Sequence, residues 1–448
     1  TVGGAFRAAA IAETESVFGK SMQGVRKYAQ GAGAIPTLSN ALRPIVKGRT
    51  VAFILPNSAT FIVSYFATLL AGGVPALINH GHPQRTIETL LADLDAALIL
   101  SDRDHTGHDT RVLNDASIHA IGNAIDPSGL VATGGPDTTA AILFSGGTTG
   151  LPKQIAHSNA AVIATMERGE WGWPTGPGEV WLPVAPFTHI YGYLMGLVNP
   201  IIHSGTVVIP ERFQPDLILD LLVDEGVTVF GGGPPAIYQA LMASEKFATA
   251  SFPNLRVCPG GGAPFPLDVQ RRWEAATGLR IYEGYGMTEI APISINTMRN
   301  APKQGAVGMA VPGTVIEIVD LERGDTVLDT GQTGEVRVKG PHMMTCYTGN
   351  QAETDIAMRH GFVYTGDIGM YTFNDCLKIM GRSKDTIVLL NGENLEPIPI
   401  EAKLCESELV DQCMVVGQDK KQLGALIVPS LEGFEAAGIK AESLAELA

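Results

Sequence analysis

The chain has 448 residues, of which 45% are hydrophobic, and a formal net charge of −15 at pH 7. This length is enough for a large buried core divided among two or three domains. Its acidity argues against a protein that wraps nucleic acid or coats an anionic membrane, so an anionic ligand has to be held by local donors.

The cysteines and histidines give no sign of a metal site. The five cysteines are odd in number, and none are paired as in a CxxC motif. The ten histidines show no HExxH spacing, so we expect reduced thiols in a cytoplasmic protein and no zinc. The chain starts without methionine and ends on "AESLAELA", and we expect both ends to be cut from something longer.

Apolar strands and helices alternate through the first half of the chain. Strands are expected at 50–56, 74–79, 96–102, 139–145, 206–210, 227–233 and 255–261, and helices at 58–71, 86–95 and 216–226. This alternation is typical of α/β layers in which mostly parallel sheets are buried on both faces.

One uncharged stretch, 59–78, is long enough to span a bilayer. However, the pair Gly72 and Gly73 and the nearby Pro75 are turn signals. A buried helix followed by a short strand is therefore the better interpretation.

The pattern changes near residue 305. From there, "VIEIVDLERGDTVLDTGQTGEVRVKG" alternates apolar and polar residues, which predicts an antiparallel, half-exposed β module. After "GRSKD" (381–385), a strand, a helix and two further strands predict a small α+β domain. We expect a large domain over 1–381, a small and incomplete one over 385–448, and a hinge at 382–385.

A glycine-rich loop, "SGGTTGLPK" (145–153), follows an apolar strand. The backbone N–H groups of such a loop can form an anion-binding concavity, to which Thr148 and Thr149 add hydroxyl donors. Lys153 adds a charge that strengthens a bond to phosphate. The Walker A spacing G-x-x-x-x-G-K-[ST] is absent, and taken alone the loop fits a phosphate site and a surface turn equally well. Ser158 or Asn159 is expected to cap a following helix.

Further on, "YEGYGMTEIAP" (282–292) places an aromatic ring, a hydroxyl and a carboxylate close together, in Tyr285, Thr288 and Glu289. These groups can stack on a base, donate to a phosphate and bind Mg²⁺. A loop with a half-buried tyrosine would have the same sequence.

In "YTGDIG" (364–369), Asp367 is expected in a tight turn. A carboxylate there can accept both hydroxyls of a ribose, as acidic residues do in dinucleotide folds, or it can simply close an Asx turn. Arg382 and Lys384, in "GRSKD", fit either a ligand contact or a solvated basic linker.

The four motifs together resemble the adenylate-forming superfamily, which contains acyl-CoA synthetases, peptide-synthetase adenylation domains and luciferases. "SGGTTGLPK", "YGMTE", "YTGD" and "GRSKDTIVLLNGENLEPIPIE" occur in that family's order, and the likeness covers nearly the whole chain from residue 51. The C-terminal part looks most like long-chain fatty acyl-CoA synthetases. The resemblance implies an α/β fold: a large domain of layered α/β subdomains with a β-rich subdomain, and a small mobile C-terminal domain.

The resemblance also implies roles for individual residues. Nucleotide contacts would come from three places: the phosphate loop, the adenine site and the ribose site. Their residues would be, in that order, Ser145, Gly147, Thr148, Thr149, Gly150 and Lys153; Gly261, Gly262, Tyr285 and Gly286; and Asp367 and Arg382. Thr288 would bond the α-phosphate, Glu289 would hold Mg²⁺, and Lys384 matches the hinge about which the small domain swings.

The segment "PVAPFTHIYGYLMG" (183–196) resembles the part of the family that lines the acid pocket. The pocket residues implied are Phe187, His189, Tyr191, Gly192, Gly233 and Ala263. A lone histidine in an apolar stretch is more often a packed core residue, but this context favours a catalytic role for His189. Apolar and aromatic walls predict a hydrophobic acid, either fatty or aryl.

The implied reaction has two half-reactions. A carboxylate attacks the α-phosphorus of ATP and expels pyrophosphate, and the thiol of CoA then attacks the acyl-adenylate. The implied cofactors are ATP, Mg²⁺ and CoA. The alternatives are transfer to a carrier-protein phosphopantetheine, closure of a β-lactone by an internal hydroxyl, and a degenerate nucleotide-binding module without catalysis.

The sequence departs from the family pattern in several places. Gly146 replaces a serine and Gln154 replaces the last glycine of the loop, from which we expect altered phosphate contact but retained function. Cys346 stands where a glycine is common, and we have no explanation for it. The family's late P-K-T-x-x-G-K lysine is absent, and Lys440 has no such motif around it, so we expect ATP binding with slow adenylate formation unless the chain is truncated.

Overall fold

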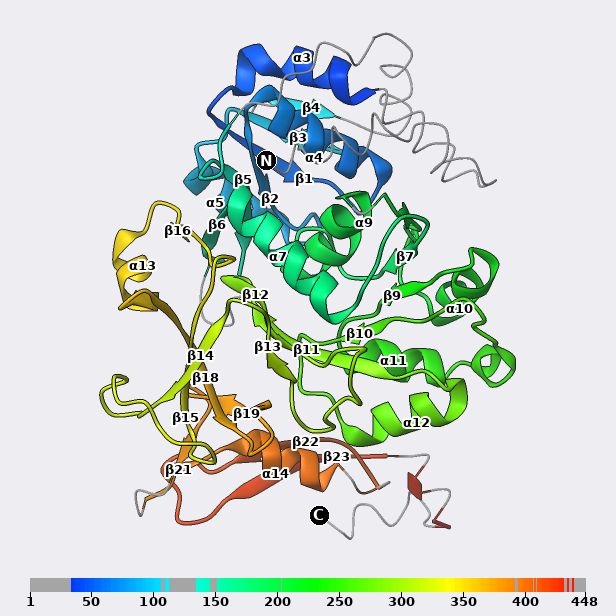
Figure 1. The fold of residues 1–448 in the computed structure, drawn as a ribbon, viewed down its shortest axis with the longest axis vertical. Helices are drawn as coiled ribbons and strands as arrows, with labels where there is room; N and C mark the ends of the chain where they lie inside the picture. The colour runs from blue at the N-terminus through cyan, green and yellow to red at the C-terminus, as the bar shows by residue number, and fades with distance from the viewer. Residues whose placement is uncertain are drawn as a thin grey trace.

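The structure is a computed structural model that describes residues 34–438 apart from 106–108, 113–133, 146–150, 203, 391–393, 406, 408, 431–432 and 435–436. Its first layer is a seven-stranded sheet in the order β16-β6-β5-β2-β1-β3-β4 (Figure 1). The strands are β1 (Thr50–Ile54), β2 (Val74–Leu77), β3 (Leu98–Ser101), β4 (Thr110–Val112), β5 (Thr139–Phe144), β6 (Gln154–Ser158) and β16 (Cys346–Tyr347). β1 to β5 pair in parallel, as the sequence predicts, and β6 and β16 join antiparallel at one edge.

Helices cover both faces of this sheet. They are α3 (Ala34–Val46), α4 (Ala59–Ala71), α5 (Gln84–Leu94) and α7 (Asn159–Gly172). Side chains alternate along β1, so that Val51 and Phe53 pack with α3, α4 and α7, whereas Ala52 and Ile54 pack with α5. Two apolar layers explain why these strands are hydrophobic at nearly every position.

The uncharged stretch 59–78 forms a buried helix and a strand. α4 ends at Ala71 because Gly72 adopts a left-handed conformation, with φ of 84°, and its N–H caps the helix. The helix is apolar all round because protein surrounds it on every side. In the described part of the chain, no helix is long and apolar enough to cross a membrane.

A second group of elements forms the middle of the molecule (Figure 1). Its strands are β7 (Val180–Pro183), β8 (Thr206–Val207), β9 (Val229–Gly231), β10 (Cys258–Gly260), β11 (Ile281–Met287), β12 (Ile290–Ile295) and β13 (Met309–Ala310). Its helices are α8 (Ile190–Gly192), the π-helix η2 (Tyr193–Val198), α9 (Asn199–Ile202), α10 (Pro215–Asp224), α11 (Pro235–Met242), the 3₁₀-helix η3 (Glu245–Thr249) and α12 (Leu267–Thr277). β7, β8 and β9 are parallel, as are β10 and β11, and the sheet then turns antiparallel through β12 and β13.

The predicted antiparallel β module is confirmed. It consists of β14 (Val315–Val319), β15 (Gly334–Lys339), β17 (Met358–Arg359), β18 (Phe362–Tyr371) and β19 (Leu377–Arg382). The helix α13 (Gln351–Ala357) comes directly before β17.

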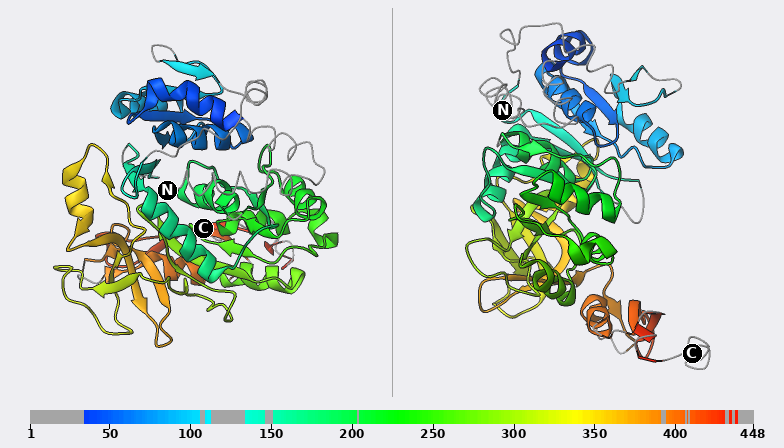
Figure 2. Two further views of the ribbon diagram at one scale, coloured as in Figure 1. Left: turned by 45° about the horizontal axis from the view of Figure 1, so that its top comes forward. Right: turned by 90° about the vertical axis from the view of Figure 1, so that its right-hand side faces the viewer.

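The last elements are β20 (Ile387–Val388), β21 (Asn394–Leu395), α14 (Pro397–Leu404), β22 (Val410–Val416) and β23 (Gly424–Pro429). In the right-hand view of Figure 2, α14, β22 and β23 project below the main body. The α/β fold class with a smaller C-terminal unit is therefore as predicted.

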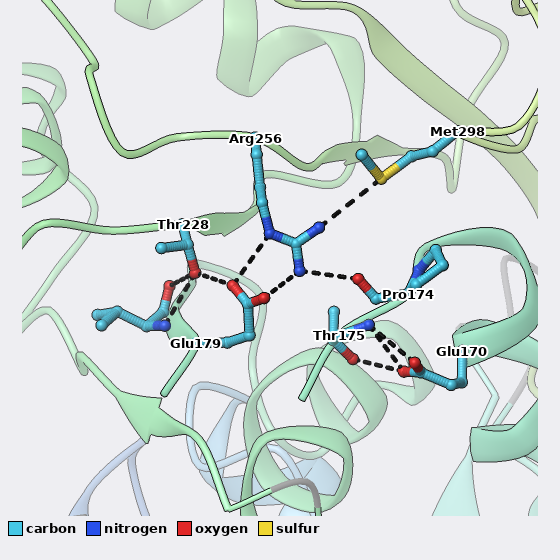
Figure 3. Close-up of polar contacts among 8 residues, drawn as sticks. Glu170, Pro174, Thr175, Glu179, Thr228, Arg256 and Met298 are labelled. Atoms are coloured by element: carbon cyan, nitrogen blue, oxygen red, sulfur yellow. Dashed lines mark hydrogen bonds and ion pairs between the residues drawn. The ribbon is translucent and has the colours of Figure 1, made fainter. Parts of the chain in front are cut away.

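Arg256 joins several segments of the middle group (Figure 3). Its guanidinium pairs with the Glu179 carboxylate and donates to the carbonyl of Pro174 at 2.7 Å. Thr228 also donates to the Glu179 carboxylate, so that the starts of β7 and β9 are tied to Arg256, two residues before β10. The bonded Pro174 follows Trp173 at the end of α7, and the cluster therefore fixes the end of that helix.

We expect Arg256→Ala to lower the free energy of unfolding by about 1–3 kcal/mol, because it leaves the mostly buried Glu179 carboxylate without its cation. Urea denaturation would measure the change. Arg272→Ala is the matched control, since its pair with Asp268 is exposed on α12 and should contribute at most about 0.5 kcal/mol. Equal losses in the two variants would contradict a structural role specific to Arg256.

Candidate active site

A cavity opens where β10 and β11 end, next to α7, the π-helix η2 and the β11–β12 hairpin. Gly260 at the end of β10 pairs in parallel with Glu283 of β11, so the residues after each of them, from Gly261 and from Gly284, lie together. The cavity is lined by Thr165, Gly169, Trp173, His189, Ile190, Tyr191, Leu194, Met195, Asn199, Gly260, Gly261, Gly262, Gly284, Tyr285, Gly286, Ala291, Pro292 and Ile295. Mainly apolar walls with a few polar groups, at strand ends in an α/β fold, are typical of a small-molecule site.

The glycine-rich loop connects two antiparallel strands, β5 and β6. Its base is closed by Ser145, whose N–H donates to the Lys153 carbonyl at 3.1 Å and whose hydroxyl accepts from the Lys153 N–H at 3.0 Å. The predicted phosphate contacts Gly147, Thr148, Thr149 and Gly150 lie outside the described residues. From the sequence we expected the loop to be followed directly by a capped helix, and we did not predict the strand β6 between them. The cap itself is confirmed, because Ser158 accepts from the Ala161 N–H at 3.1 Å.

Lys153 and Glu289, two predicted ligand contacts, are joined through residues that sequence reasoning missed. The Lys153 ammonium forms an ion pair with Glu353 of α13 at 2.5 Å and lies 4.8 Å from the centre of the Tyr347 ring. The Tyr347 hydroxyl in turn donates to Glu289 Oε1 at 2.7 Å. Tyr347 of β16 therefore contacts both the lysine of the loop and the acidic residue of the hairpin, and Glu353 of α13 pairs with that lysine. Neighbouring sequence carries no sign of these contacts, because the partners are far apart in the chain.

Thr288 and Glu289 occupy the two-residue turn between β11 and β12. Met287 pairs with Ile290 across this turn, which is therefore tight. Glu289 is only 6% exposed, although it lies in a turn. A buried carboxylate at the tip of a rigid hairpin is held in a fixed place, as a ligand-binding group requires.

Two buried histidines, also missed from the sequence, hold the backbone of this hairpin. His157 Nε2 donates to the Thr288 carbonyl at 2.7 Å, and His342 Nε2 donates to the Pro292 carbonyl at 2.6 Å. Because a carbonyl only accepts, the proton of each ring lies on Nε2. Burial lowers the pKa of both imidazoles to about 4, so both are neutral at pH 7.

Tyr285, Asp367 and Arg382 come together at the side of the cavity. The Tyr285 hydroxyl donates to Asp367 Oδ2 at 2.5 Å, and Arg382 Nε donates to Asp367 Oδ1 at 2.8 Å. Burial raises the pKa of the Asp367 carboxyl, and the two donors oppose that rise. Asp367 lies within β18 opposite Arg382, so the prediction that it occupies a turn is wrong. Since Tyr285 lines the cavity, the carboxylate is one hydrogen bond from it.

His189 stands at the rim of the cavity. Its Nδ1 accepts the N–H of Tyr191 at 3.1 Å, which requires that nitrogen to be unprotonated. His189 is an exposed residue, yet desolvation by the protein around its ring lowers the pKa of the imidazole. Tyr191 lines the cavity as predicted, and its hydroxyl donates to the Pro259 carbonyl at 3.1 Å.

Four of the predicted pocket residues do not line this cavity. They are Phe187, Gly192, Gly233 and Ala263. Phe187 is fully buried in the core, with its ring edge against Phe61. A Cβ at Gly192 would lie 2.1 Å from the Pro186 carbonyl oxygen, so the glycine is needed for backbone packing.

The predicted glycines Gly261, Gly262 and Gly286 all line the cavity. A Cβ at Gly261 would lie 2.6 Å from the Gly284 carbonyl oxygen, so this glycine is required for the close approach of two backbones. Lys384 lies in the exposed turn after β19. Over the described ranges, no three His, Cys, Asp or Glu side chains gather as metal ligands.

Comparison with known proteins gives a consistent result. A family model described as "AMP-binding enzyme" matches residues 26–348, and one described as "AMP-binding enzyme C-terminal domain" matches residues 384–447. The chain is 27% identical to a long-chain-fatty-acid–CoA ligase of Bacillus subtilis (strain 168), over 83% of this chain and 74% of the relative. It is also 27% identical to a feruloyl-CoA synthase of Amycolatopsis sp, over 90% of this chain and 83% of that relative.

Among solved structures, the fold is similar to that of ATP-bound MatB from Rhodopseudomonas palustris. The TM-score is 0.82 at 27% identity, over 90% of this chain and 85% of that chain. The similarity thus extends over both the large and the small parts of the molecule.

Proposed function

Because this chain belongs to the AMP-binding enzyme family, we propose that it activates a carboxylic acid with ATP and transfers the acyl group to CoA as a thioester. The observation that carries this proposal is the hydrogen bond between Tyr285 and Asp367. It brings two of the predicted nucleotide contacts, from different sheets, together at the cavity that also contains Gly261 and Gly262.

In this proposal, the nucleotide lies along the ends of β10 and β11. Asp367 accepts the ribose hydroxyls, with Arg382 beside it, and Tyr285 lies against the adenine. Thr288 meets the α-phosphate. Lys153 neutralises the β- and γ-phosphates, for which it would have to exchange its ion pair with Glu353 for one with phosphate.

The residues present fit a magnesium ion. Mg²⁺ usually keeps several waters and is bound through one or two carboxylates plus substrate phosphates. Glu289 supplies one such carboxylate, buried and fixed by the Tyr347 hydroxyl, next to Thr288. When bound, the ion would offset charge on the triphosphate during displacement of pyrophosphate.

Catalysis in this scheme is mainly positioning and charge neutralisation. The acid carboxylate attacks the α-phosphorus, pyrophosphate leaves, and the CoA thiol then attacks the carbonyl carbon and releases AMP. We propose that residues 1–381 form the large domain and 385–448 the small one, with a hinge at 382–385 that contains Lys384. The small part projects from the main body, as the right-hand view of Figure 2 shows, which is the arrangement a swinging domain requires.

The acid is proposed to be mainly hydrophobic. The relatives act on acids as different as long fatty chains and feruloyl groups, so the acid class rests on the cavity itself. Its walls include Trp173, Leu194 and Met195, and no lysine or arginine among the residues that the structure describes lines it. Burying the apolar surface of an acid against this wall stabilises the complex by about 25 cal/mol per Å² of surface removed from water.

We expect pyrophosphate exchange when the protein is incubated with ATP, Mg²⁺ and a suitable member of a panel of carboxylic acids. AMP release should require CoA, because the thiol is the acceptor in the second half-reaction. AMP release that needs a carrier protein instead would identify the alternative acceptor. ATP binding without exchange for any acid would show a nucleotide-binding module without catalysis and would contradict the proposed function.

A further inference from the structure

Two of the five cysteines meet in the C-terminal unit, which is formed by β20, β21, α14, β22 and β23 and projects from the main body in Figure 2. Cys405 caps the end of α14, and Cys413 lies in β22. Their sulfur atoms are 3.6 Å apart, although the residues are eight positions apart in the chain. Both thiols are free in the structure, and the distance has to shorten by about 1.5 Å to reach the length of a disulfide bond.

Glu401 of α14 keeps the two cysteines next to each other. Its carbonyl accepts the Cys405 N–H at 2.9 Å and the Cys413 thiol at 3.4 Å, and its side-chain Oε1 accepts the Val415 N–H at 2.8 Å. Cys413 and Val415 are two residues apart in a strand, so both point to the face of β22 on which α14 packs. The approach of the two sulfurs is therefore built into the contact of α14 with β22.

The C-terminal unit has a small hydrophobic core. Among the described residues, its cluster contains three buried side chains, of Ile387, Leu389 and Val415, and partly buried ones of Leu395, Ile400, Leu404 and Leu423. The strands β22 and β23 also leave apolar residues at least half exposed, namely Met414, Leu426, Ile427 and Val428. Small units that bury little apolar surface are marginally stable, and a covalent cross-link is a common way to stabilise them.

Other uses of the cysteine pair fit the structure less well. A structural metal site needs about four ligands, but over the described residues no third His, Cys, Asp or Glu side chain joins the two thiols. Cys405 is exposed, so it does not fill a core as the buried Cys258 and Cys376 do. An accessible thiol beside a second thiol is the arrangement in which redox-active cysteines are found.

We propose that Cys405 and Cys413 form a reversible disulfide that joins the end of α14 to β22 and stabilises the C-terminal unit. The oxidant is another disulfide of low molecular weight, for which glutathione disulfide is the probe. The inference does not depend on the proposed function, because neither cysteine lines the cavity.

The surroundings of the two sulfurs decide which one reacts first. Desolvation, and then the neighbouring Cys405 thiol, raise the pKa of the Cys413 thiol to about 11. Only the thiolate is a nucleophile, so the exposed Cys405 is the thiol that attacks glutathione disulfide. Once Cys405 carries glutathione, its own thiol no longer opposes ionisation of Cys413.

The reaction consists of two thiol–disulfide exchanges. The Cys405 thiol loses its proton and attacks one sulfur of glutathione disulfide, which forms a mixed disulfide and releases one glutathione thiolate. The Cys413 thiol then loses its proton and attacks the Cys405 sulfur, and the second glutathione thiolate leaves. The protein gives up two electrons and two protons, which convert glutathione disulfide into two glutathione thiols.

A redox titration of the full chain tests for the bond. The protein is equilibrated in mixtures of reduced and oxidised glutathione, quenched in acid, unfolded and alkylated with N-ethylmaleimide, and the alkylated thiols are counted by mass spectrometry. Since the chain has five cysteines, we expect five alkylated thiols in the reduced protein and three in the oxidised one. The tryptic peptide 404–420 contains Cys405 and Cys413 and no other cysteine, so in the oxidised protein it should carry no maleimide and be lighter by two hydrogen atoms.

Three serine variants sharpen this test. In Cys413→Ser the second step has no thiol, so glutathione should stay on Cys405. Cys405→Ser should form no disulfide within the peptide 404–420. Cys346→Ser is the control, since it removes a partly exposed thiol of β16, in another sheet, and should leave this disulfide formed at the same glutathione ratio.

Limited proteolysis tests the stabilising effect. A cross-link removes conformations from the unfolded state, so cleavage within residues 385–448 should be slower by about tenfold or more in the oxidised protein than in the reduced protein. The oxidised and reduced forms of Cys405→Ser should be cleaved at equal rates.

The outcomes separate the parts of the inference. Five alkylated thiols at every glutathione ratio, a mixed disulfide in the wild type that never closes, or a bond between other cysteines would overturn the inference. A disulfide within 404–420 that leaves the rate of cleavage unchanged would overturn its stabilising role. Absence of pyrophosphate exchange with every acid would overturn the proposed function and would leave this inference as it stands.

Discussion

Asp367→Ala is expected to weaken the binding of both ATP and AMP by roughly 10- to 100-fold, or about 1–3 kcal/mol, the usual cost of removing a charged hydrogen-bond partner. Asp367 is 4% exposed, and its carboxylate is already held by Tyr285 and Arg382, so it is oriented before the ribose arrives. Isothermal titration calorimetry with each nucleotide would measure the loss.

Lys153→Ala provides the matched comparison. The lysine is proposed to contact only the β- and γ-phosphates, so its removal should weaken ATP binding by about tenfold and leave AMP binding nearly unchanged. Asp367→Asn keeps the shape of the side chain and is the control for a folding defect in the alanine variant. Equal losses for ATP and AMP in the lysine variant, or unchanged affinities in both aspartate variants, would mean that the nucleotide lies elsewhere.

Local sequence patterns were enough to predict the layered part of the fold. The parallel strands of the first sheet are nearly uniformly apolar because helices cover both faces, and this leaves a clear signal at 50–56, 74–79 and 139–145. The helix cap at Ser158 and the end of α4 at Gly72 could also be predicted, since each depends on residues within one turn.

The errors arise where distant segments meet. The glycine-rich loop joins a hairpin because β6 pairs with β5 on one side and with β16, far along the chain, on the other. Asp367 was placed in a turn because "YTGD" has turn composition, whereas β18 continues through the segment with a bulge at Gly366 (φ of 69°), and Asp367 pairs with Arg382 of β19. Tertiary pairing overrides local propensity in both cases.

The residues of the site divide in the same way. Tyr285, Thr288, Glu289 and Asp367 could be proposed from the sequence because they belong to motifs that are continuous in sequence. The residues that hold the site could not be predicted, since His157, Tyr347 and Glu353 contact Thr288, Glu289 and Lys153 across the fold. The partner of a buried polar group is a three-dimensional fact, and a single sequence contains no record of it.

Glu289 gives the second large expected effect. Glu289→Gln keeps the size of the side chain but removes the charge that is proposed to bind Mg²⁺. We expect kcat for pyrophosphate exchange to fall by about 100-fold or more, because a metal in such a site contributes several kcal/mol of charge stabilisation. The Mg²⁺ concentration for half-maximal exchange should also rise, which a titration at fixed ATP would show.

Tyr347→Phe separates the role of the carboxylate from that of its support. It removes the 2.7 Å hydrogen bond to Glu289 but keeps the charge, so we expect a smaller loss of roughly 10-fold, typical of groups that orient a metal ligand. Because the Tyr347 ring also lies against the Lys153 ammonium, and phenylalanine keeps that contact, the variant tests the hydroxyl alone. If Glu289→Gln lost no more activity than Tyr347→Phe and its Mg²⁺ requirement stayed the same, Glu289 would be a structural acceptor for the tyrosine and the metal would be held by other groups.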